Sequence, residues 1–204
     1  MDGFFLFLWF LHYGNECAIL ISENEFERRY TMEFDKLIDQ RYSVRSFQPV
    51  HLPQEVIDKI LLSGHKAPTG CNYQPQRILV LNTDESIAKL KECTKCHFNA
   101  PTAMLVCHNR EESWVRKYDG ARSSSVDAAI VATHMMLSAF NEGVGCCWVM
   151  HFDPSAMRNA FAIPENVEPV ALLVMGYPSE DAKPLALHYE SRPIEECVFY
   201  DEFK

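Results

Sequence analysis

A short segment, Arg41-Tyr42-Ser43-Val44-Arg45-Ser46-Phe47, carries polar side chains at a spacing suited to anion binding. In an extended segment alternate side chains share a face, so Arg41, Ser43 and Arg45 are expected to point the same way. Two guanidinium groups with a hydroxyl between them supply charge-assisted, partly bidentate hydrogen bonds, which suit a phosphate better than a single carboxylate. The segment therefore predicts a phosphate grip, with an exposed edge strand bearing solvated arginines as the alternative.

A second polar segment, Ala67-Pro68-Thr69-Gly70-Cys71-Asn72-Tyr73-Gln74-Pro75-Gln76, comes just before the apolar residues 78–81. Its prolines and glycine predict an irregular loop. Asn72 and Gln74 carry side-chain amides that both donate and accept hydrogen bonds, so they suit the polar edge of a ring. The alternative is an ordinary loop in which Asn72 bonds to its own backbone.

A third segment, Gly143-Val144-Gly145-Cys146-Cys147-Trp148-Val149-Met150, combines glycines with β-branched and aromatic residues. The glycines are expected to end a helix and to allow close backbone approach, and the residues after them to form a strand. Core packing is the alternative for Trp148 and the favoured interpretation for Cys146 and Cys147, for which we predict no catalytic role.

Helices and strands must position these three segments. Apolar spacing predicts a first helix that leads into the arginine segment, and a second that begins at Pro53. Further helices are predicted over 84–94, from Val126 to about Asn141 behind a Ser123-Ser124-Ser125 N-cap, and after Asp153-Pro154. Buried strands are predicted at 102–107 and within 169–177.

Composition limits the class of protein. A chain of 204 residues with 48% hydrophobic and 23% charged residues fits one globular domain with an ample core. The formal net charge of −9 argues against nucleic acid as a partner over a broad surface. Any phosphate bound here is expected to be small and locally held.

The 8 cysteines are scattered through apolar segments of a chain too long to need disulfides for stability, so we expect reduced thiols in a cytoplasmic protein. Cys93 and Cys96 have the spacing of a redox pair. No second pair at metal-site spacing accompanies them, and no strand-to-helix junction of the thioredoxin kind frames them. A thiol redox protein is thus the weakest of the functions considered.

The first residues invite a separate explanation. Phe4 to Leu11 is an unbroken apolar run, but it is too short to span a bilayer, and Asp2 stands where a signal peptide carries positive charge. The residues Glu27-Arg28-Arg29 can be encoded by a purine-rich AGGAGG box, shortly before Met32. We expect that Met32 is the natural start and that residues 1–31 are translated upstream sequence without a fold.

The Arg-x-Ser-x-Arg pattern of residues 41–45, followed about one helix later by Ala-Pro-Thr-Gly-Cys-Asn-Tyr-Gln-Pro at 67–75, resembles the paired signatures of the nitroreductase family of FMN-dependent oxidoreductases. Residues 143–148 resemble the family's Gly-Leu-Gly-x-Cys-Trp stretch. The joint occurrence of these patterns in order is more specific than any one of them. The resemblance covers roughly residues 33–203.

This resemblance implies an α+β fold with a mostly antiparallel central sheet flanked by helices, in an intertwined homodimer with one FMN at each subunit contact. It implies a single FMN-binding domain over residues 32–204. We then expect Arg41, Ser43 and Arg45 to bind the FMN phosphate, and Asn72 and Gln74 to contact the edge of the flavin ring.

Two further sets of cofactor-binding residues follow from the resemblance. In the family, backbone amides near the Gly-x-Gly-x-Cys-Trp stretch face the reactive nitrogen of the flavin ring, which implies Cys147, Trp148 and Val149. The family's tail brings one more basic residue to the phosphate. Arg192 is the candidate. The alternatives are Lys183 in the same role and an exposed Arg192 that binds no ligand.

Residues and resemblance together predict a flavoenzyme that takes a hydride from NAD(P)H onto FMN and reduces a flat, electron-poor acceptor such as a nitroaromatic or a quinone. The two substrates would use the same site in turn. No charged residue is placed as an acid or base, so we predict no catalytic side chain and no metal. The alternatives are a same-fold enzyme with dehalogenase or ring-dehydrogenating chemistry, and a flavin sensor or store without turnover. We expect no membrane partner.

Overall fold

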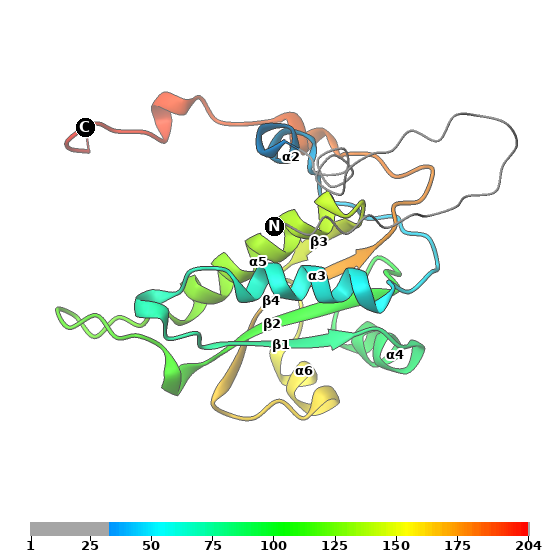
Figure 1. Ribbon diagram of the computed structural model, residues 1–204, viewed down its shortest axis with the longest axis horizontal. Helices are drawn as coiled ribbons and strands as arrows, with labels where there is room; N and C mark the ends of the chain where they lie inside the picture. Colours follow the sequence, from blue (N-terminus) through cyan, green and yellow to red (C-terminus); the bar gives the residue numbers. More distant parts are fainter. Residues whose placement is uncertain (1–32, 204) are drawn as a thin grey trace, which may run out of the picture. The chain divides into compact units, whose positions relative to one another are not determined.

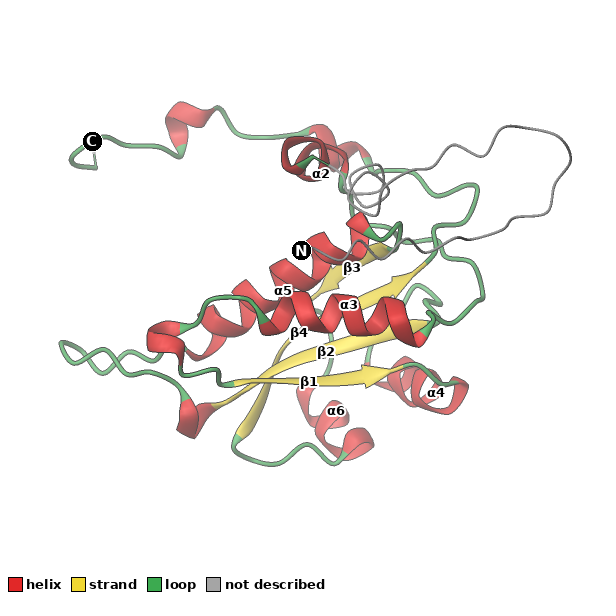
Figure 2. Ribbon diagram, in the orientation of Figure 1, coloured by secondary structure: helices red, strands yellow, loops and turns green. Residues whose placement is uncertain are grey.

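The computed structural model describes residues 33–203. The predicted extension over residues 1–31 and the predicted start at Met32 lie outside the described residues. Figure 1 shows the described chain coloured along its sequence, and Figure 2 shows it coloured by secondary structure.

A four-stranded sheet with the order β1-β2-β4-β3 forms the centre of the fold, and every neighbouring pair is antiparallel. β2 is buried along its whole length, because it lies inside the sheet and has helices on both faces. β1 and β3 form the edges. The strands are β1 (Gln76–Leu81), β2 (Thr102–Asn109), β3 (Gly145–Val149) and β4 (Val167–Gly176).

Helices cover both faces of this sheet (Figure 2). α3 and α5 cover one face, and α4 and α6 cover the other. The α-helices are α2 (Phe34–Gln40), α3 (Gln54–His65), α4 (Asp84–Cys93), α5 (Ser124–Asn141) and α6 (Pro154–Phe161). Short 3-10 helices are η1 (Gly70–Asn72), η2 (Arg110–Glu112), η3 (Ala186–Tyr189) and η4 (Ile194–Glu196).

Small residues allow α3 and α5 to pack closely. Ala128, Ala132 and Ala139 are fully buried on one face of α5. Gly64 of α3 faces the same helix, and a Cβ at that position would come 2.7 Å from Cγ of Met135. The small residues of the two helices therefore let α3 lie close against α5.

The α+β fold and the antiparallel sheet are confirmed, with small differences at helix starts. Pro53 precedes α3 as its N-cap residue instead of opening the helix. The predicted N-cap hydroxyl of α5 is wrong, because Ser123 occupies the N-cap position but its hydroxyl donates to the side chain of Asp127. Asp153 caps α6 as the Asp-Pro pair predicts, accepting from the N–H groups of Ser155 and Ala156.

Candidate active site

The arginine segment lies beside the free edge of β3. The N–H of Val44 donates to the carbonyl of Cys146 at 3.1 Å, and Ser43 pairs with Cys146 in a parallel bridge. Phe47 forms a second isolated bridge to Pro178. The segment therefore covers an exposed sheet edge without forming a regular strand, so strict alternation of its side chains does not hold.

The structure groups Ser43 with Arg45 and gives Arg41 different neighbours. Nη1 of Arg45 donates to the carbonyl of Ser43 at 3.0 Å, and its guanidinium lies 5.8 Å from the centre of the Phe98 ring. Nη1 of Arg41 lies 3.9 Å from Sδ of Met136 on α5. The three side chains are close in sequence, but the two cations face different elements.

The pKa shifts of two neighbouring thiols show the same separation of Arg41 from Arg45. Burial raises the pKa of the Cys146 thiol, and the charge of Arg41 opposes that rise. Burial also raises the pKa of the Cys147 thiol, which the charge of Arg45 and a hydrogen bond with Ser43 oppose. Successive residues of a strand point to opposite faces, so Arg41 lies nearer one face of β3 and Arg45 nearer the other.

Both cations are available to an anion. Arg77, Arg110 and Arg116 are neutralised by Glu112, Glu168 and Asp119, respectively. Within residues 33–203, in contrast, neither Arg41 nor Arg45 forms an ion pair with a carboxylate, and the contacts described above are to neutral groups. Each of these uncompensated guanidinium groups can donate to a phosphate at the sheet edge, although the two lie nearer opposite faces of β3.

The amide loop between α3 and β1 has a constrained backbone. Cys71, Asn72 and Gln74 have φ angles of 47°, 58° and 51°, in the left-handed region that non-glycine residues seldom adopt. Nε2 of Gln74 donates to Oδ1 of Asn72 at 3.1 Å, so the two amides lie side by side. Both side chains are exposed. The loop therefore presents a paired, accessible set of amide groups.

Asp127, which the sequence analysis did not single out, anchors this loop. Its side chain is 2% exposed, and its Oδ1 accepts from the N–H of Gly70 at 2.8 Å. Its Oδ2 accepts from the hydroxyl of Ser123 at 2.5 Å. The signal that could have identified it is the helical spacing, which puts this aspartate on the same face as the apolar Val131 and Met135, both fully buried.

In one chain the arginine segment and the amide loop do not converge. The loop is attached to α5 at Asp127 and Arg41 contacts the same helix at Met136, nine residues further on. At the rise of an α-helix this is about 14 Å along the axis, on opposite sides of the helix. A ligand that uses both sets must be elongated, or must receive one set from a second chain.

The remaining predicted site residues lie on β3 and in the C-terminal tail. Cys147 and Val149 are buried in β3, and Trp148 is half-buried between them. Arg192 is exposed between η3 and η4. The structure thus places Trp148 on the strand that the arginine segment covers, and does not bring Arg192 to that segment.

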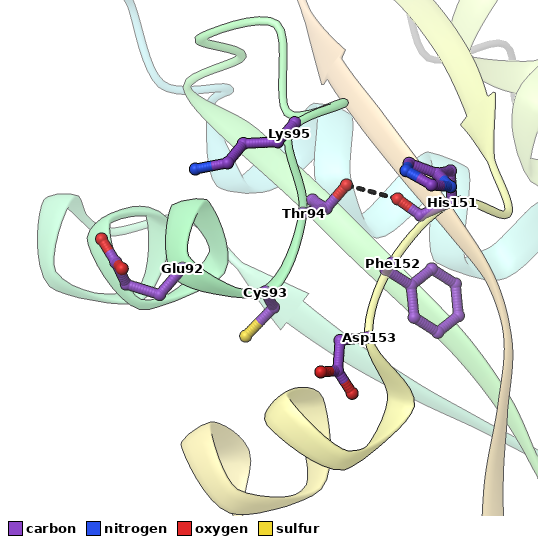
Figure 3. Close-up of a pocket in the computed structure, with 7 residues that line it drawn as sticks. All are labelled: Glu92, Cys93, Thr94, Lys95, His151, Phe152 and Asp153. Atoms are coloured by element: carbon purple, nitrogen blue, oxygen red, sulfur yellow. Dashed lines mark hydrogen bonds between the residues drawn. The ribbon is translucent and has the colours of Figure 1, made fainter.

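A shallow pocket lies elsewhere, between the end of α4 and the start of α6 (Figure 3). Its volume is about 310 Å³, and the hydroxyl of Thr94 donates to the carbonyl of His151 across it. Glu92 and Asp153 line it together with Lys95, so its lining carries no excess of positive charge that would favour a phosphate. None of the predicted cofactor residues lines this pocket, so we assign the candidate site to the β3 edge and the amide loop.

Two features are absent from residues 33–203. Among residues 33–203, no three His, Cys, Asp or Glu side chains gather in a way that could hold a metal ion. None of the helices in this part of the chain has the length and apolar character needed to cross a membrane.

A model of the nitroreductase family matches residues 38–113 and 95–177, which together span most of the described chain. The chain belongs to the nitroreductase family. It is therefore an oxidoreductase, as the resemblance of residues 41–45, 67–75 and 143–148 predicts.

Relatives with curated names support this membership. The chain is 29% identical over 157 residues to a protein of Methanothermobacter thermautotrophicus named NADH dehydrogenase/NAD(P)H nitroreductase, covering 74% of this chain and 80% of the relative. It is 24% identical over 187 residues to the 5,6-dimethylbenzimidazole synthase of Rhodospirillum rubrum, covering 76% and 87% of the two chains.

Solved structures agree with the fold. A nitroreductase family protein from Clostridium difficile 630 is 38% identical, with a TM-score of 0.78 over 84% of this chain and 100% of the other. An FMN-dependent nitroreductase, also from Clostridium difficile, is 22% identical with a TM-score of 0.68 over 83% of this chain and 100% of the other. At that identity the second structure supports the nitroreductase fold alone.

Proposed function

We propose that this nitroreductase binds FMN, accepts reducing equivalents from NAD(P)H, and reduces a flat, electron-poor acceptor such as a nitroaromatic or a quinone. The observation that carries the proposal is the pair of arginines, Arg41 and Arg45, whose charges no described carboxylate neutralises, on the edge of β3. The names of the relatives, which include NAD(P)H nitroreductase and FMN-dependent nitroreductase, are consistent with it.

The residues present suit FMN in both charge and hydrogen bonding. Arg41, Ser43 and Arg45 would contact the phosphate end, where guanidinium groups and a hydroxyl match a dianion. Asn72 and Gln74 would contact the polar edge of the ring, because paired amides can satisfy both donors and acceptors there.

Two other sets of residues would complete the cofactor site. Backbone groups of Cys147, Trp148 and Val149 would face the ring, since β3 lies directly beside the arginine segment. Arg192 stays the candidate for a further cation at the phosphate, although it does not reach the arginine segment within one chain.

The chain's residues need to orient the cofactor and its substrates and to supply favourable electrostatics. They do not need to supply an acid or a base. Bound FMN supplies the redox chemistry, since it can accept a hydride from a nicotinamide and return electrons to a second substrate. The thiols beside the site do not compete for this role, because burial raises the pKa of Cys147 and disfavours the reactive thiolate. We propose that donor and acceptor occupy the same open face in turn, as a ping-pong mechanism requires.

We further propose that the cofactor lies at a contact between two copies of this chain. Asp127 and Met136 mark attachment points about 14 Å apart on α5, so one chain does not close a site around the cofactor. The C-terminal tail is also apolar and exposed, with Leu187, Tyr189, Tyr200 and Phe203 between 72% and 90% exposed. Such a tail is suited to packing against a second copy.

A cytoplasmic location is part of the proposal. The cysteines within residues 33–203 form no disulfide. Reduced thiols are typical of proteins in a reducing compartment.

Purified protein tests the function directly. An absorbance scan should show bound oxidised flavin, and anaerobic NADH or NADPH should bleach that absorbance within seconds. Added nitroaromatic or quinone should then restore it. Bound flavin that stays oxidised would indicate a sensor or store, and protein that takes up no FMN would disprove the proposal.

A further inference from the structure

Asp127 is the buried carboxylate that the proposed chemistry leaves without a role. It lies in the first turn of α5, where the partial positive charge of the helix N-terminus favours an anion. Burying a carboxylate is costly unless it is hydrogen-bonded, and Asp127 meets this need with donors from two other places. These are the N–H of Gly70 and the hydroxyl of Ser123.

The bond from Gly70 ties the amide loop to the rest of the fold. The other hydrogen bonds that residues 69–74 make in the described chain stay within the loop: Asn72 N–H to Thr69 O, Tyr73 N–H to Gly70 O, Gln74 N–H to Thr69 Oγ1, and the Gln74–Asn72 amide pair. A loop with three non-glycine residues in the left-handed region stores backbone strain. Such a loop keeps its shape only when its surroundings hold it.

The base of a hairpin over residues 114–123 also packs against Gly70. A Cβ at Gly70 would come 3.1 Å from Cβ of Ser123 and 3.2 Å from Cβ of Trp114. These two residues close the base of a hairpin over residues 114–123, where the N–H of Ser123 donates to the carbonyl of Trp114 at 2.9 Å. The amide loop, the hairpin base and the start of α5 therefore meet at Asp127.

We infer that Asp127 is a positioning residue, which holds Asn72 and Gln74 in the geometry that contacts the flavin ring and fixes the base of the 114–123 hairpin beside them. The inference rests on the proposed function for the identity of the ligand. Its structural part, that Asp127 holds the loop, stands independently of any ligand.

Three variants separate positioning from general stability. Asp127→Ala removes both hydrogen bonds. Asp127→Asn keeps an oxygen that can accept from the N–H of Gly70. Its amide nitrogen can donate to the hydroxyl of Ser123, which then acts as the acceptor. Asp153→Ala is the matched control, because Asp153 also accepts two N–H groups at a helix start but lies on α6, on the other face of the sheet.

Hydrogen exchange of the backbone amides of residues 70–74, measured without FMN, reads out the loop itself. We expect Asp127→Ala to speed this exchange about 10-fold or more, as loss of a hydrogen bond to a charged group implies, and Asp127→Asn to restore most of the protection. Asp153→Ala should leave the loop unchanged. Equal loop exchange in Asp127→Ala and wild type would overturn the inference.

FMN binding and turnover supply the second readout. Titration followed by flavin fluorescence should show about 10- to 100-fold weaker FMN binding for Asp127→Ala, and KM for the acceptor should rise more than kcat falls. Asp127→Asn should recover most of both. Unchanged affinity in Asp127→Ala would count against the ligand part. A wild-type protein that binds no FMN would instead refute the proposed function and leave the exchange test intact.

If Asp127→Ala does not fold, Ser123→Ala takes its place, since it removes the bond to Oδ2 and leaves the bond to Gly70. The exchange rate of the loop amides should then rise, but by a smaller factor than the one predicted above for Asp127→Ala. No rise in loop exchange for Ser123→Ala would then overturn the inference.

Discussion

Val44 lies so close to Gly145 that a Cβ built on the glycine would come 2.8 Å from Cγ2 of the valine. Val44 is 1% exposed, and its N–H donates to the carbonyl of Cys146. The arginine segment therefore fits against the start of β3 only because residue 145 has no side chain. The positions of Arg41 and Arg45 depend on this contact.

Gly145→Ala should displace the arginine segment. The new methyl group would approach three side-chain atoms of a stiff β-branched residue at 2.8 to 2.9 Å, and such overpacking costs about 1 to 3 kcal/mol of unfolding free energy. FMN content should fall with it. Gly64→Ala is the control, because it crowds Met135 at the contact of α3 with α5. A Gly145→Ala protein with full FMN content would show that the segment does not hold the cofactor.

Arginine variants should weaken FMN binding unequally. Arg45→Ala and Arg41→Ala each remove a charged hydrogen-bond donor, which we expect to weaken binding about 10- to 100-fold. Because Arg45 is exposed and Arg41 contacts Met136, the two losses should differ in size. Arg45→Lys should recover part of the affinity, since it keeps the charge but not the forked geometry.

Equilibrium dialysis at micromolar FMN measures these losses. Arg77→Ala is the control, because Arg77 is paired with Glu112 and lies outside the candidate site. If Arg45→Ala retained its flavin as well as Arg77→Ala does, the predicted phosphate grip would be wrong.

Local signals explain why the scaffold could be predicted. The strand at 102–107 is a continuous apolar run, and α4 follows Thr83, whose hydroxyl accepts from the N–H of Ser86 in a capping box. Patterns of this kind are contained within a few residues, so they can be identified in one sequence. The resemblance of three short segments then supplied the family.

The geometry of the site depended on contacts that no local pattern contains. Asp127 accepts a hydrogen bond from Gly70, which lies 57 residues away in the sequence. An aspartate in a first helical turn is ordinarily explained by the helix dipole. Likewise, alternation in residues 41–45 assumed a regular strand. The bridges at Ser43 and Phe47 leave the segment irregular, so Arg41 and Arg45 came to face different elements.

The Cys93 and Cys96 pair should be dispensable. Burial raises the pKa of the Cys93 thiol, with Asp153 and Glu92 adding to the effect, so the reactive thiolate is disfavoured. Replacing both residues with serine should leave NAD(P)H-dependent acceptor reduction within about twofold of wild type, apart from a small cost in stability. Steady-state kinetics with a quinone checks this. Loss of turnover with FMN still bound would revive a thiol mechanism.

His108 should make stability depend on pH. It is 3% exposed, and burial lowers its pKa although Glu168 lies 3.4 Å from Nε2 and opposes the shift. The unfolded chain therefore binds a proton at about pH 6.5 while the folded chain does not. The free energy of unfolding is highest above this pH and falls as the pH drops below it.

Urea unfolding on both sides of pH 6.5 measures this effect. His108→Asn should show a smaller loss of stability on acidification than wild type. Some loss should remain, because burial lowers the pKa of His97 as well. His65→Asn, at an exposed position, is the control. Equal acid sensitivity in wild type and His108→Asn would contradict the assignment.

The exposed tail should determine the oligomeric state. Leu187 and Phe203 are 72% and 90% exposed in one chain, and burying them against a second copy is worth about 1.5 to 3 kcal/mol for each side chain. Leu187→Asp combined with Phe203→Asp should therefore convert the proposed dimer into a monomer in sedimentation experiments, and the helix and strand content should stay unchanged. FMN should be lost together with the partner if the cofactor lies at the subunit contact.

Tyr118→Asp, at the 98% exposed tip of the 114–123 hairpin, is the matched control and should remain dimeric. A double variant that stays dimeric would exclude the tail as the contact, and a monomer that keeps its FMN would place the whole site within one chain.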